Sequence, residues 1–352
     1  MANFSTHSVA ISGVAACVPK KQERNRDLAN LSSEDIDKFI ATTGVEARRI
    51  VDDHICTSDL CLAAAEKLIH DLDWDKKEIE ILVFVSQTGD YTLPVTSTIL
   101  QDRLGLSQEC IAFDVPLGCS GYVYGLSIIS GMMAATRLKK GILLVGDTIS
   151  KINSENDKST TPLFGDAGSA TCLTYDDHAE PIHFNLGSDG SGYQSIMVES
   201  GGFRNQTSKD SFEPKVIADG IERNQLQLSL DGMDVFSFGI SQAPKTIKAL
   251  VESFSINLTS VDFFFFHQAN LMMNKMIVKK LKLNPEKIPY SLKEFGNTSS
   301  ASIPLTIVNH IGREKSISYT GDLILCGFGV GLSWGTCFVK LNNTFISELL
   351  EI

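Results

Sequence analysis

Two stretches of the chain repeat one order: a continuous apolar run, a helical pattern, and later a second apolar run. The first runs are Ile79 to Thr88 and Val261 to Gln268, and the second runs are Gly141 to Asp147 and Gly321 to Gly327. Continuous apolar runs are typical of strands that are covered on both faces. We therefore expect an α/β protein of two duplicated halves, with helices on both sides of largely parallel sheets.

The repeat predicts a division of the 352 residues into an N-terminal half, 1–180, and a C-terminal half, 181–352. Within the second half, the stretch at about 193–227 departs from the pattern because it is rich in Gly, Ser, Asn and charged residues. This composition is typical of a cap or insertion over a pocket, and it is equally typical of an ordinary surface loop.

Charge and the lack of targeting signals narrow the classes of function. The formal net charge is −11 and the pI is near 5.1, which opposes general attraction to nucleic-acid phosphates. The N-terminus has no cationic start followed by an apolar run, and no apolar stretch reaches the roughly 18 residues that a membrane helix needs. We expect a cytoplasmic protein that neither spans a membrane nor binds nucleic acid.

Cys119 stands apart from the other cysteines of the chain. The eight cysteines are far apart, with no C-x-x-C pair and no histidine spacing typical of zinc, so no metal site is predicted. Most such cysteines are small hydrophobic fillers. At Cys119, however, an apolar strand gives way to small residues and then to a helical run. A cysteine at a helix N-terminus is expected to have a lowered thiol pKa and to act as a nucleophile.

Three later segments are further candidates. His267 ends an apolar strand, where open α/β sheets place ligands, although a hydrogen-bonded core histidine would fit the same surroundings. Asn297 lies in a polar loop and alone would be interpreted as a turn or helix cap. The stretch from Gly327 to Gly335 fails the G-x-G-x-x-G spacing and precedes a strand, so we reject a nicotinamide site. As a turn between strands it would expose backbone N–H groups suited to an oxyanion.

Taken together, these segments resemble the thiolase-fold condensing enzymes, most closely the β-ketoacyl-acyl-carrier-protein synthase III branch. His-Gln-Ala-Asn followed by Gly-Asn-Thr-Ser, both after the cysteine, is a highly specific combination. The resemblance spans nearly the whole chain and is carried by Thr43-Gly44-Val45 with Arg48-Arg49-Ile50, Asp114 to Gly121, Leu163 to Gly168, Asp231-Gly232 with Val235-Phe236, Phe266 to Asn270, Gly296 to Ser299, and Gly327 to Gly335.

The resemblance implies a five-layer α-β-α-β-α sandwich, a homodimer, an acyl carrier protein (ACP) as partner, and no metal or organic cofactor. Cys119 would take an acyl group from a thioester, while the backbone N–H groups of Cys119 and Val330 hold the oxyanion. His267 and Asn297 would bind the thioester oxygen of a malonyl extender, most simply malonyl-ACP, and stabilise the enolate that forms as carbon dioxide leaves. That carbon would attack acyl-Cys119 to give a β-ketoacyl product.

The same resemblance assigns residues to binding. Leu93 and Phe328 would shape the acyl pocket and its gate. Lys279 and Lys280, on a helix end, would receive an acidic carrier protein, although a solvated helix end explains the two lysines equally well.

Five positions depart from the family pattern. Lys38 and Thr42 stand where a Trp and an Arg sandwich the adenine of coenzyme A, so the acyl donor could be linked to CoA or to ACP. Met272 replaces an Arg implicated in carrier docking. Leu93 replaces an aromatic residue from the dimer partner, and Val330 replaces a Gly, which predicts a differently shaped acyl pocket. We expect a specialised paralogue, not necessarily the initiator of bulk fatty-acid synthesis.

Several activities share this scaffold. A hydroxymethylglutaryl-CoA synthase would need an additional glutamate acid, and a biosynthetic thiolase a second reactive cysteine; the sequence has no clear motif for either. An acyltransferase that forms an ester or amide without decarboxylation, in a lipid, polyketide or glycan pathway, would keep the same three residues. A non-catalytic acyl-binding subunit would normally lack the nucleophile that Cys119 provides.

Overall fold

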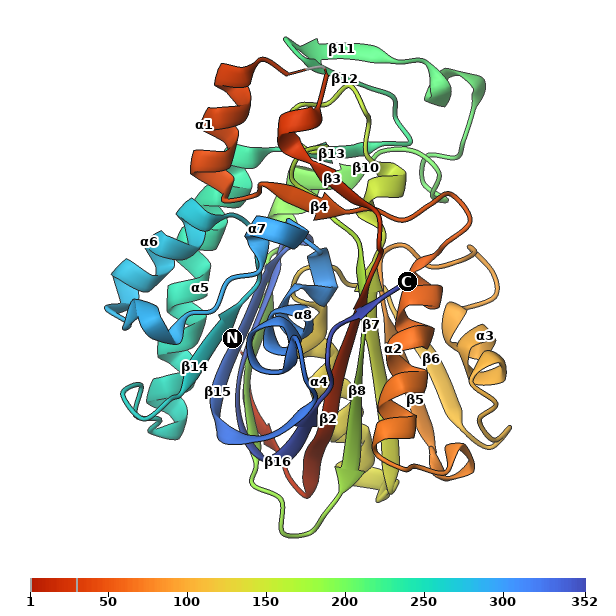
Figure 1. Cartoon of the computed structure of the whole chain (residues 1–352), viewed down its shortest axis with the longest axis vertical. Helices are drawn as coiled ribbons and strands as arrows, with labels where there is room; N and C mark the ends of the chain where they lie inside the picture. The colour runs from red at the N-terminus through yellow and green to blue at the C-terminus, as the bar shows by residue number, and fades with distance from the viewer. Residues whose placement is uncertain (1, 30) are drawn as a thin grey trace.

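The computed structural model describes residues 2–29 and 31–352, in which eleven strands form one continuous mixed sheet (Figure 1). One strand joins its two parts, which are called the first sheet and the second sheet below. Their strands are β1 (Ala2–Thr6), β2 (Val9–Val18), β5 (Ile81–Val85), β6 (Ile111–Val115), β7 (Lys140–Asp147), β8 (Ala167–Tyr175), β9 (Ile182–Ser188), β14 (Phe263–Phe266), β15 (Ile317–Gly329), β16 (Ser333–Ile346) and β17 (Leu350–Glu351). The first sheet has the order β6-β5-β7-β8-β2, and the second has the order β14-β15-β16-β9-β1. The far end of β16 pairs with β2 and joins the two sheets.

The two sheets repeat one pattern of strand directions. In the first sheet β5 pairs with β7 in parallel, and the next two pairs, β7 with β8 and β8 with β2, are antiparallel. In the second sheet β14 pairs with β15 in parallel, and the next two pairs, β15 with β16 and β16 with β9, are antiparallel. Because β5 and β14 are the first apolar runs of the two stretches, and β7 and β15 the second, the predicted duplication is confirmed. The predicted division after residue 180 falls between β8 and β9.

The prediction of largely parallel sheets is wrong. Parallel pairing is confined to β5 with β6 and β7, to β14 with β15, and to short contacts of β2 with β16 and β17. A strand that is buried on both faces is apolar whatever its direction. Continuous apolar runs therefore indicate that helices cover both faces of the sheet, but they do not indicate the strand direction. The chain also returns from β7 to β8 without an α-helix, which an antiparallel connection permits.

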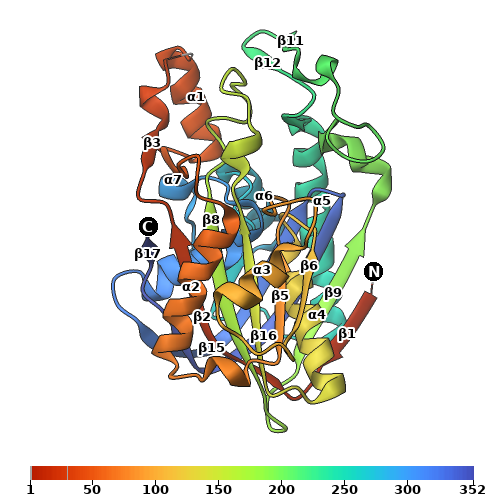
Figure 2. The same cartoon turned by 90° about the vertical axis from the view of Figure 1, so that its right-hand side faces the viewer.

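Helices fill the space between the sheets and cover both outer faces, which gives the five expected layers (Figures 1 and 2). α4 (Gly121–Thr136) and α8 (Ser302–Ile307) pack between the sheets, α2 (Thr57–Asp71) and α3 (Thr96–Arg103) cover the first sheet, and α5 (Gly232–Phe254) and α6 (Leu271–Leu281) cover the second. α4 can occupy the centre because it carries no charged side chain. At Gly125 of α4 a Cβ would come within 2.8 Å of Leu143, so glycine allows the close approach to β7.

Smaller elements gather at one end of the molecule, the upper end in Figures 1 and 2. They are β3 (Gln22–Arg24), β4 (Ala47–Arg49), β10 (Ile196–Val198), β11 (Lys215–Ala218), β12 (Ile221–Arg223), β13 (Leu228–Leu230), α1 (Ser33–Thr43) and, just below them, α7 (Leu292–Phe295). β10 pairs with β13, and β11 with β12. The stretch 193–227 therefore leaves the body of the protein along β10 and returns into β13.

Short helical turns complete the structure. They are η1 (Asn25–Asp27), η2 (Lys76–Glu78), η3 (Ile149–Ile152), η4 (Gly190–Ser195), η5 (Lys209–Phe212), η6 (Pro285–Lys287), η7 (Ser299–Ala301) and the π-helical η8 (Val308–Gly312). η7 begins two residues after Asn297 and leads into α8, so it fixes the loop that carries this candidate residue.

Candidate active site

Cys119 lies in the turn between β6 and α4, two residues before the helix begins at Gly121. The residue is buried, with 8% of its surface exposed. Gly329 at the end of β15 packs directly against it, and a Cβ at this position would lie 2.9 Å from the Cys119 sulfur. The sequence places a glycine there because no other side chain would fit between the second sheet and the nucleophile.

The thiol of Cys119 is protonated in the free cavity. Burial raises its pKa to about 11, while the backbone N–H of Val330 and the hydroxyl of Ser299 act in the opposite direction and Asp147 adds to the rise. The predicted low thiol pKa is therefore wrong, because desolvation outweighs the nearby donors. Those donors are nevertheless placed to stabilise negative charge that develops at the sulfur during reaction.

His267 follows β14 directly and is 1% exposed. Its backbone N–H donates to the Cys326 carbonyl at 2.8 Å, which extends the pairing with β15. Its ring atom Nδ1 lies 2.7 Å from the hydroxyl of Ser302. Burial lowers the pKa of His267 to about 3, and an opposing contact with the backbone of Ser299 does not overcome this effect. The imidazole is therefore neutral at pH 7.

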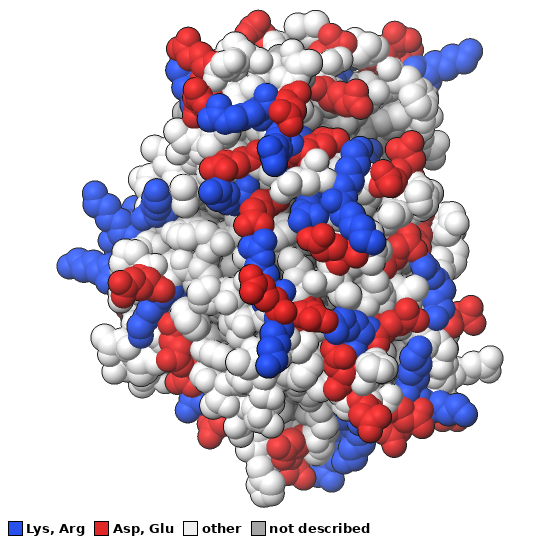
Figure 3. All heavy atoms as spheres, viewed as in Figure 1, with Lys and Arg blue, Asp and Glu red and all other residues white. Residues whose placement is uncertain are grey.

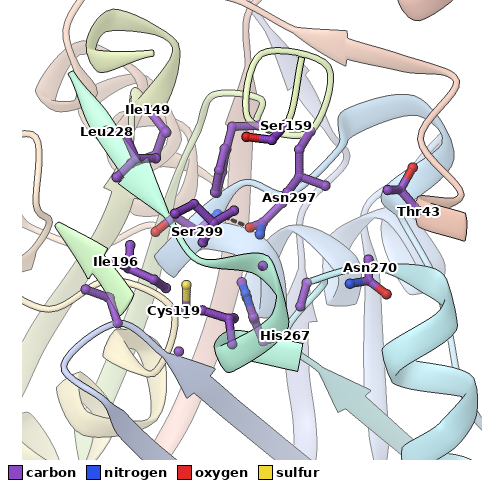
Figure 4. A pocket seen from close by; sticks show the side chains of 18 of the residues that line it. Thr43, Cys119, Ile149, Ser159, Ile196, Leu228, His267, Asn270, Asn297 and Ser299 are labelled. Atoms are coloured by element: carbon purple, nitrogen blue, oxygen red, sulfur yellow. Dashed lines mark hydrogen bonds between the residues drawn. The ribbon is translucent and has the colours of Figure 1, made fainter. Parts of the chain in front are cut away.

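Asn297 is oriented by its own loop. Its side-chain Oδ1 accepts the N–H of Ser299 at 2.9 Å, which leaves the Nδ2 donor to face the cavity (Figure 4). Its backbone N–H donates to the Leu163 carbonyl at 2.9 Å, and its carbonyl accepts the N–H of Gly165 at 3.1 Å. The Leu163 to Gly168 segment therefore holds Asn297 in place from the other half of the protein.

Cys119, His267 and Asn297 line one cavity of about 410 Å³. Figure 4 shows the sulfur, the imidazole and the carboxamide directed into the same space from separate elements. Phe328 and Val330 line this cavity as well. Two neutral donors and a thiol in a pocket without charged walls are suited to acyl transfer.

The other predicted binding residues lie outside the cavity. Leu93 is 80% exposed and does not line the cavity of its own chain. Lys279 and Lys280 are exposed on the last turn of α6. Lys38 is exposed and forms an ion pair with Glu34 at 2.7 Å. None of the residues lining this cavity is Lys, Arg, Asp or Glu.

The cavity wall also includes parts of the molecule other than the predicted catalytic residues. α1, η3, the Leu163 segment and α5 contribute apolar side chains, and so do β10 and β13 at the base of the 193–227 stretch. These side chains include Phe39, Ile152, Leu163, Ile196, Leu228 and Val235. The stretch therefore borders the pocket at its base, while β11 at its tip is exposed.

Ser299 is a functional residue that the sequence analysis missed. It has a positive φ of 49°, which is uncommon for a residue other than glycine. Its N–H binds Asn297, its hydroxyl contacts the Cys119 sulfur, and its backbone contacts the His267 ring. The available signal was the hydroxyl-rich segment Thr298-Ser299-Ser300-Ala301-Ser302, because such a segment before an apolar helix can supply several buried hydrogen bonds.

Within residues 2–29 and 31–352, no group of three or more His, Cys, Asp or Glu side chains is arranged to bind a metal ion. Among the helices of this described part, none is both long and apolar enough to cross a membrane. The eight cysteines are all unpaired thiols.

Comparison with known proteins agrees with this geometry. Residues 113–190 match the family "3-Oxoacyl-[acyl-carrier-protein (ACP)] synthase III", and residues 251–341 match the family of its C-terminal part. The chain is 32% identical to the β-ketoacyl-ACP synthase III of Clostridioides difficile strain 630 over 332 residues, which cover 94% of this chain and 97% of the relative. The chain belongs to the synthase III family. It is therefore a condensing acyltransferase.

Solved synthase structures agree with the fold in detail. A 3-oxoacyl-ACP synthase from Burkholderia xenovorans LB400 superposes with a TM-score of 0.92 at 35% identity, covering 100% of this chain and 99% of that one. The synthase III of Pseudomonas aeruginosa PAO1 gives a TM-score of 0.81 at 26% identity, over 95% and 98% of the two chains. The thiolase-like architecture expected for synthase III is thereby confirmed.

Proposed function

We propose that this synthase III acylates Cys119 from an ACP-linked thioester and condenses the acyl group with malonyl-ACP, with loss of carbon dioxide, in fatty-acid or related acyl-chain synthesis. The observation that carries the proposal is the convergence of Cys119, His267 and Asn297 on one cavity without charged walls. An acyltransferase without decarboxylation would keep the same three residues, and the release of carbon dioxide is what separates it from the condensing enzyme.

In the first half-reaction the Cys119 sulfur attacks the thioester carbonyl, and the bond from that carbon to the carrier sulfur breaks. The Cys119 proton leaves with the carrier thiol, so the step balances without an added base. The N–H of Val330 already contacts the Cys119 sulfur, and together with the Cys119 N–H it forms the proposed oxyanion hole. One such donor typically contributes about 10²–10³ in rate.

In the second half-reaction His267 and Asn297 donate to the thioester oxygen of the malonyl group. The bond to the carboxylate breaks, its electron pair forms the enolate, and the enolate carbon attacks the acyl carbon on Cys119. The Cys119 sulfur then leaves as a thiolate and takes up one proton from water, which balances the loss of the malonyl carboxylate as carbon dioxide. When Ser302 donates to Nδ1 of His267, the ring proton lies on Nε2, which gives the neutral donor that this step requires.

Malonyl decarboxylation should be insensitive to pH between about 5 and 9. The folded-state pKa of His267 is lowered to about 3, so its neutral form persists well below the ordinary histidine pKa near 6.5. Activity should fall only as the pH approaches the lowered value, provided that the protein stays folded. A pH profile of carbon dioxide release checks this, and a titration step near pH 6.5 would contradict a buried neutral imidazole.

We propose ACP-linked acyl groups, and not acyl-CoA, as the preferred donors. The adenine end of CoA carries phosphates and an aromatic base, which bind best to cations and aromatic side chains. At the two positions of the stacking pair this chain has Lys38, which is paired with Glu34, and Thr42, whose hydroxyl donates to the Lys38 carbonyl. Neither residue lines the cavity.

One experiment tests both parts of the proposal. The protein is incubated with matched acyl-CoA and acyl-ACP thioesters, and the adduct on Cys119 is read by intact mass. Labelled malonyl-ACP is then added, and released carbon dioxide is counted. We expect faster acylation from ACP and release of carbon dioxide with product. Strong preference for acetyl-CoA would contradict the donor assignment, and product without carbon dioxide would favour the non-decarboxylating transferase.

Lys279 and Lys280 are proposed to receive the acidic carrier. Basic side chains project from the edge of the molecule occupied by α6 (Figure 3), and α6 also supplies Met273 to the cavity. Lys280 donates to the Ile240 carbonyl at 2.9 Å, whereas the Lys279 ammonium group has no hydrogen-bond or ion-pair partner among the described residues. The free cation on an otherwise acidic protein favours long-range attraction of an acidic partner.

A homodimer is proposed because β6 ends the first sheet and is flanked by exposed apolar side chains. Tyr91, Leu93, Val95 and Ile111 are all exposed. The carboxylate of Asp114 in β6 binds the N–H groups of Thr96 and Ser97, which holds the 91–95 segment beside this edge. A second copy that covers this edge would pair the free backbone groups of β6 and remove the apolar side chains from water. It would also bring Leu93 to the partner's pocket.

We also propose that the enzyme works in the cytoplasm and needs no metal or organic cofactor. Eight free thiols suit a reducing compartment. The proposed steps need only the two thioesters, this chain's own groups and one proton from water.

A further inference from the structure

Asp147 is a buried carboxylate behind the catalytic residues, at the end of β7. It is fully buried, and it forms no ion pair with any basic side chain in the described part of the chain. A buried charge needs several hydrogen bonds to offset the loss of water. Asp147 has them: Oδ1 accepts from the Gln87 N–H at 2.7 Å, the Ser86 hydroxyl at 3.1 Å and the Thr88 hydroxyl at 3.3 Å. Oδ2 accepts from the Ser300 hydroxyl at 2.6 Å and its N–H at 3.2 Å.

These contacts join the two halves of the enzyme at the active site. Ser86 and Gln87 follow β5 in the first half, whereas Ser300 lies in η7, three residues after Asn297. The hydroxyl of Ser299 contacts both the Asp147 carboxylate and the Cys119 sulfur. The strained φ of Ser299 persists only if neighbouring contacts hold it, and Asp147 binds the next residue along the chain.

The charge of Asp147 does not activate the nucleophile. Its electrostatic effect raises the pKa of the Cys119 thiol, which opposes thiolate formation. A contribution to the reaction must therefore come through geometry. Each carboxylate oxygen accepts one backbone N–H, from Gln87 and from Ser300. Hydroxyl groups can rotate to adapt to a different neighbour, but backbone N–H groups cannot.

We infer that Asp147 is a positioning residue that clamps the 297–300 turn, so that Asn297 and Ser299 face the reacting groups. The inference rests on the proposed decarboxylating function. Asp147→Asn keeps the size of the side chain but replaces one accepting oxygen with NH₂. If the new NH₂ group takes the place of Oδ1, it faces the Gln87 N–H and the Gln87 segment must move. If it takes the place of Oδ2, it faces the Ser300 N–H and the 297–300 turn must move.

The variant should lose decarboxylation far more than acylation. A displacement of about 1 Å at a reacting group can cost about 10²-fold in rate, so we expect carbon dioxide release from malonyl-ACP to fall by about 10²-fold. Cys119 acylation from acyl-ACP should also fall, but by less than about tenfold, because the Ser299 contact with the sulfur weakens while the Val330 contact does not depend on Asp147. The ratio of the two rates, measured on one preparation of known folded fraction, is the readout.

Thr344→Val is the control for general destabilisation. Thr344 is also buried, its hydroxyl donates to the Ile11 carbonyl at 2.8 Å, and it neither lines the cavity nor lies in a segment that holds a catalytic residue. The variant should show a fall in melting temperature while the ratio of decarboxylation to acylation stays at the wild-type value. If Asp147→Asn lowers both rates equally, as general destabilisation would, the positioning role is overturned.

Ser300→Ala provides a second test if Asp147→Asn does not fold. It removes the 2.6 Å hydroxyl contact and leaves the backbone N–H in place, so decarboxylation should fall by about fivefold to tenfold with acylation preserved. Unchanged decarboxylation in Ser300→Ala would overturn the inference. Failure of the wild-type protein to release carbon dioxide would instead overturn the proposed function, so the two failures are distinguishable.

Discussion

Cys119→Ala will accept no acyl group, and its rate of condensation will fall by at least about 10⁴-fold, as is typical when an enzymatic nucleophile is removed. The methyl group of alanine cannot attack a thioester, and no other thiol among the residues lining the cavity can replace it. Intact-mass measurement after exposure to acyl-ACP should show no adduct. Malonyl decarboxylation should continue, because His267 and Asn297 bind the extender without the sulfur.

Cys172→Ala is the matched control for this experiment. Cys172 is also fully buried, but it lies in β8 within the core between the first sheet and α2. Its replacement should cost some stability through the cavity that it leaves, while the acyl adduct still forms. An adduct of normal yield in Cys119→Ala would show that another residue carries the acyl group and would overturn the assignment of the nucleophile.

The sequence could predict the fold because apolar runs and their order carry the information about layers. The paired apolar runs at β5 and β14, and at β7 and β15, are sufficient to predict the duplication from the sequence. Strand direction was not accessible in the same way. β8 and β16 are as buried as parallel strands would be, so their composition does not distinguish an antiparallel return from a crossover.

Candidate site residues could be predicted from the sequence where a residue of a type suited to the chemistry lies in a recognisable motif. Cys119, His267 and Asn297 belong to this class, and the structure places them on one cavity. Electrostatic state was not predictable from position along the chain. A helix N-terminus argues for a low thiol pKa, but whether desolvation exceeds that effect depends on what packs over the sulfur, which here includes Gly329 from the other half.

Supporting residues escaped the sequence analysis for a related reason. Asp147 ends an ordinary buried strand, and its hydrogen bonds reach residues 60 and 153 positions away in the chain. Ser299 is one serine among several, and only its backbone conformation and its contacts with four site residues distinguish it. Groups that act by holding other groups have no sequence spacing of their own, because the fold alone brings them together.

Asn297→Asp will lower decarboxylation by at least about 10³-fold while Cys119 still becomes acylated. The substitution keeps the oxygen that accepts the Ser299 N–H at 2.9 Å, so the turn should retain its shape. It replaces the Nδ2 donor with a carboxylate oxygen that faces the oxygen of the developing enolate. Loss of one preorganised donor costs about 10²–10³ in rate, and repulsion between two negative charges in a dry cavity adds to that cost. Carbon dioxide release and adduct mass measure the two effects separately.

Asn297→Ala completes the comparison, because it removes both the donor and the acceptor for Ser299. It should therefore reduce decarboxylation and also slow acylation, since the Ser299 hydroxyl that contacts the Cys119 sulfur is no longer held by the same turn. The aspartate variant should spare acylation, and this difference separates the direct role of the amide from its support of the turn. If Asn297→Asp decarboxylates malonyl-ACP within tenfold of the wild-type rate, the enolate is not stabilised by this side chain, and His267 would have to supply the donor alone.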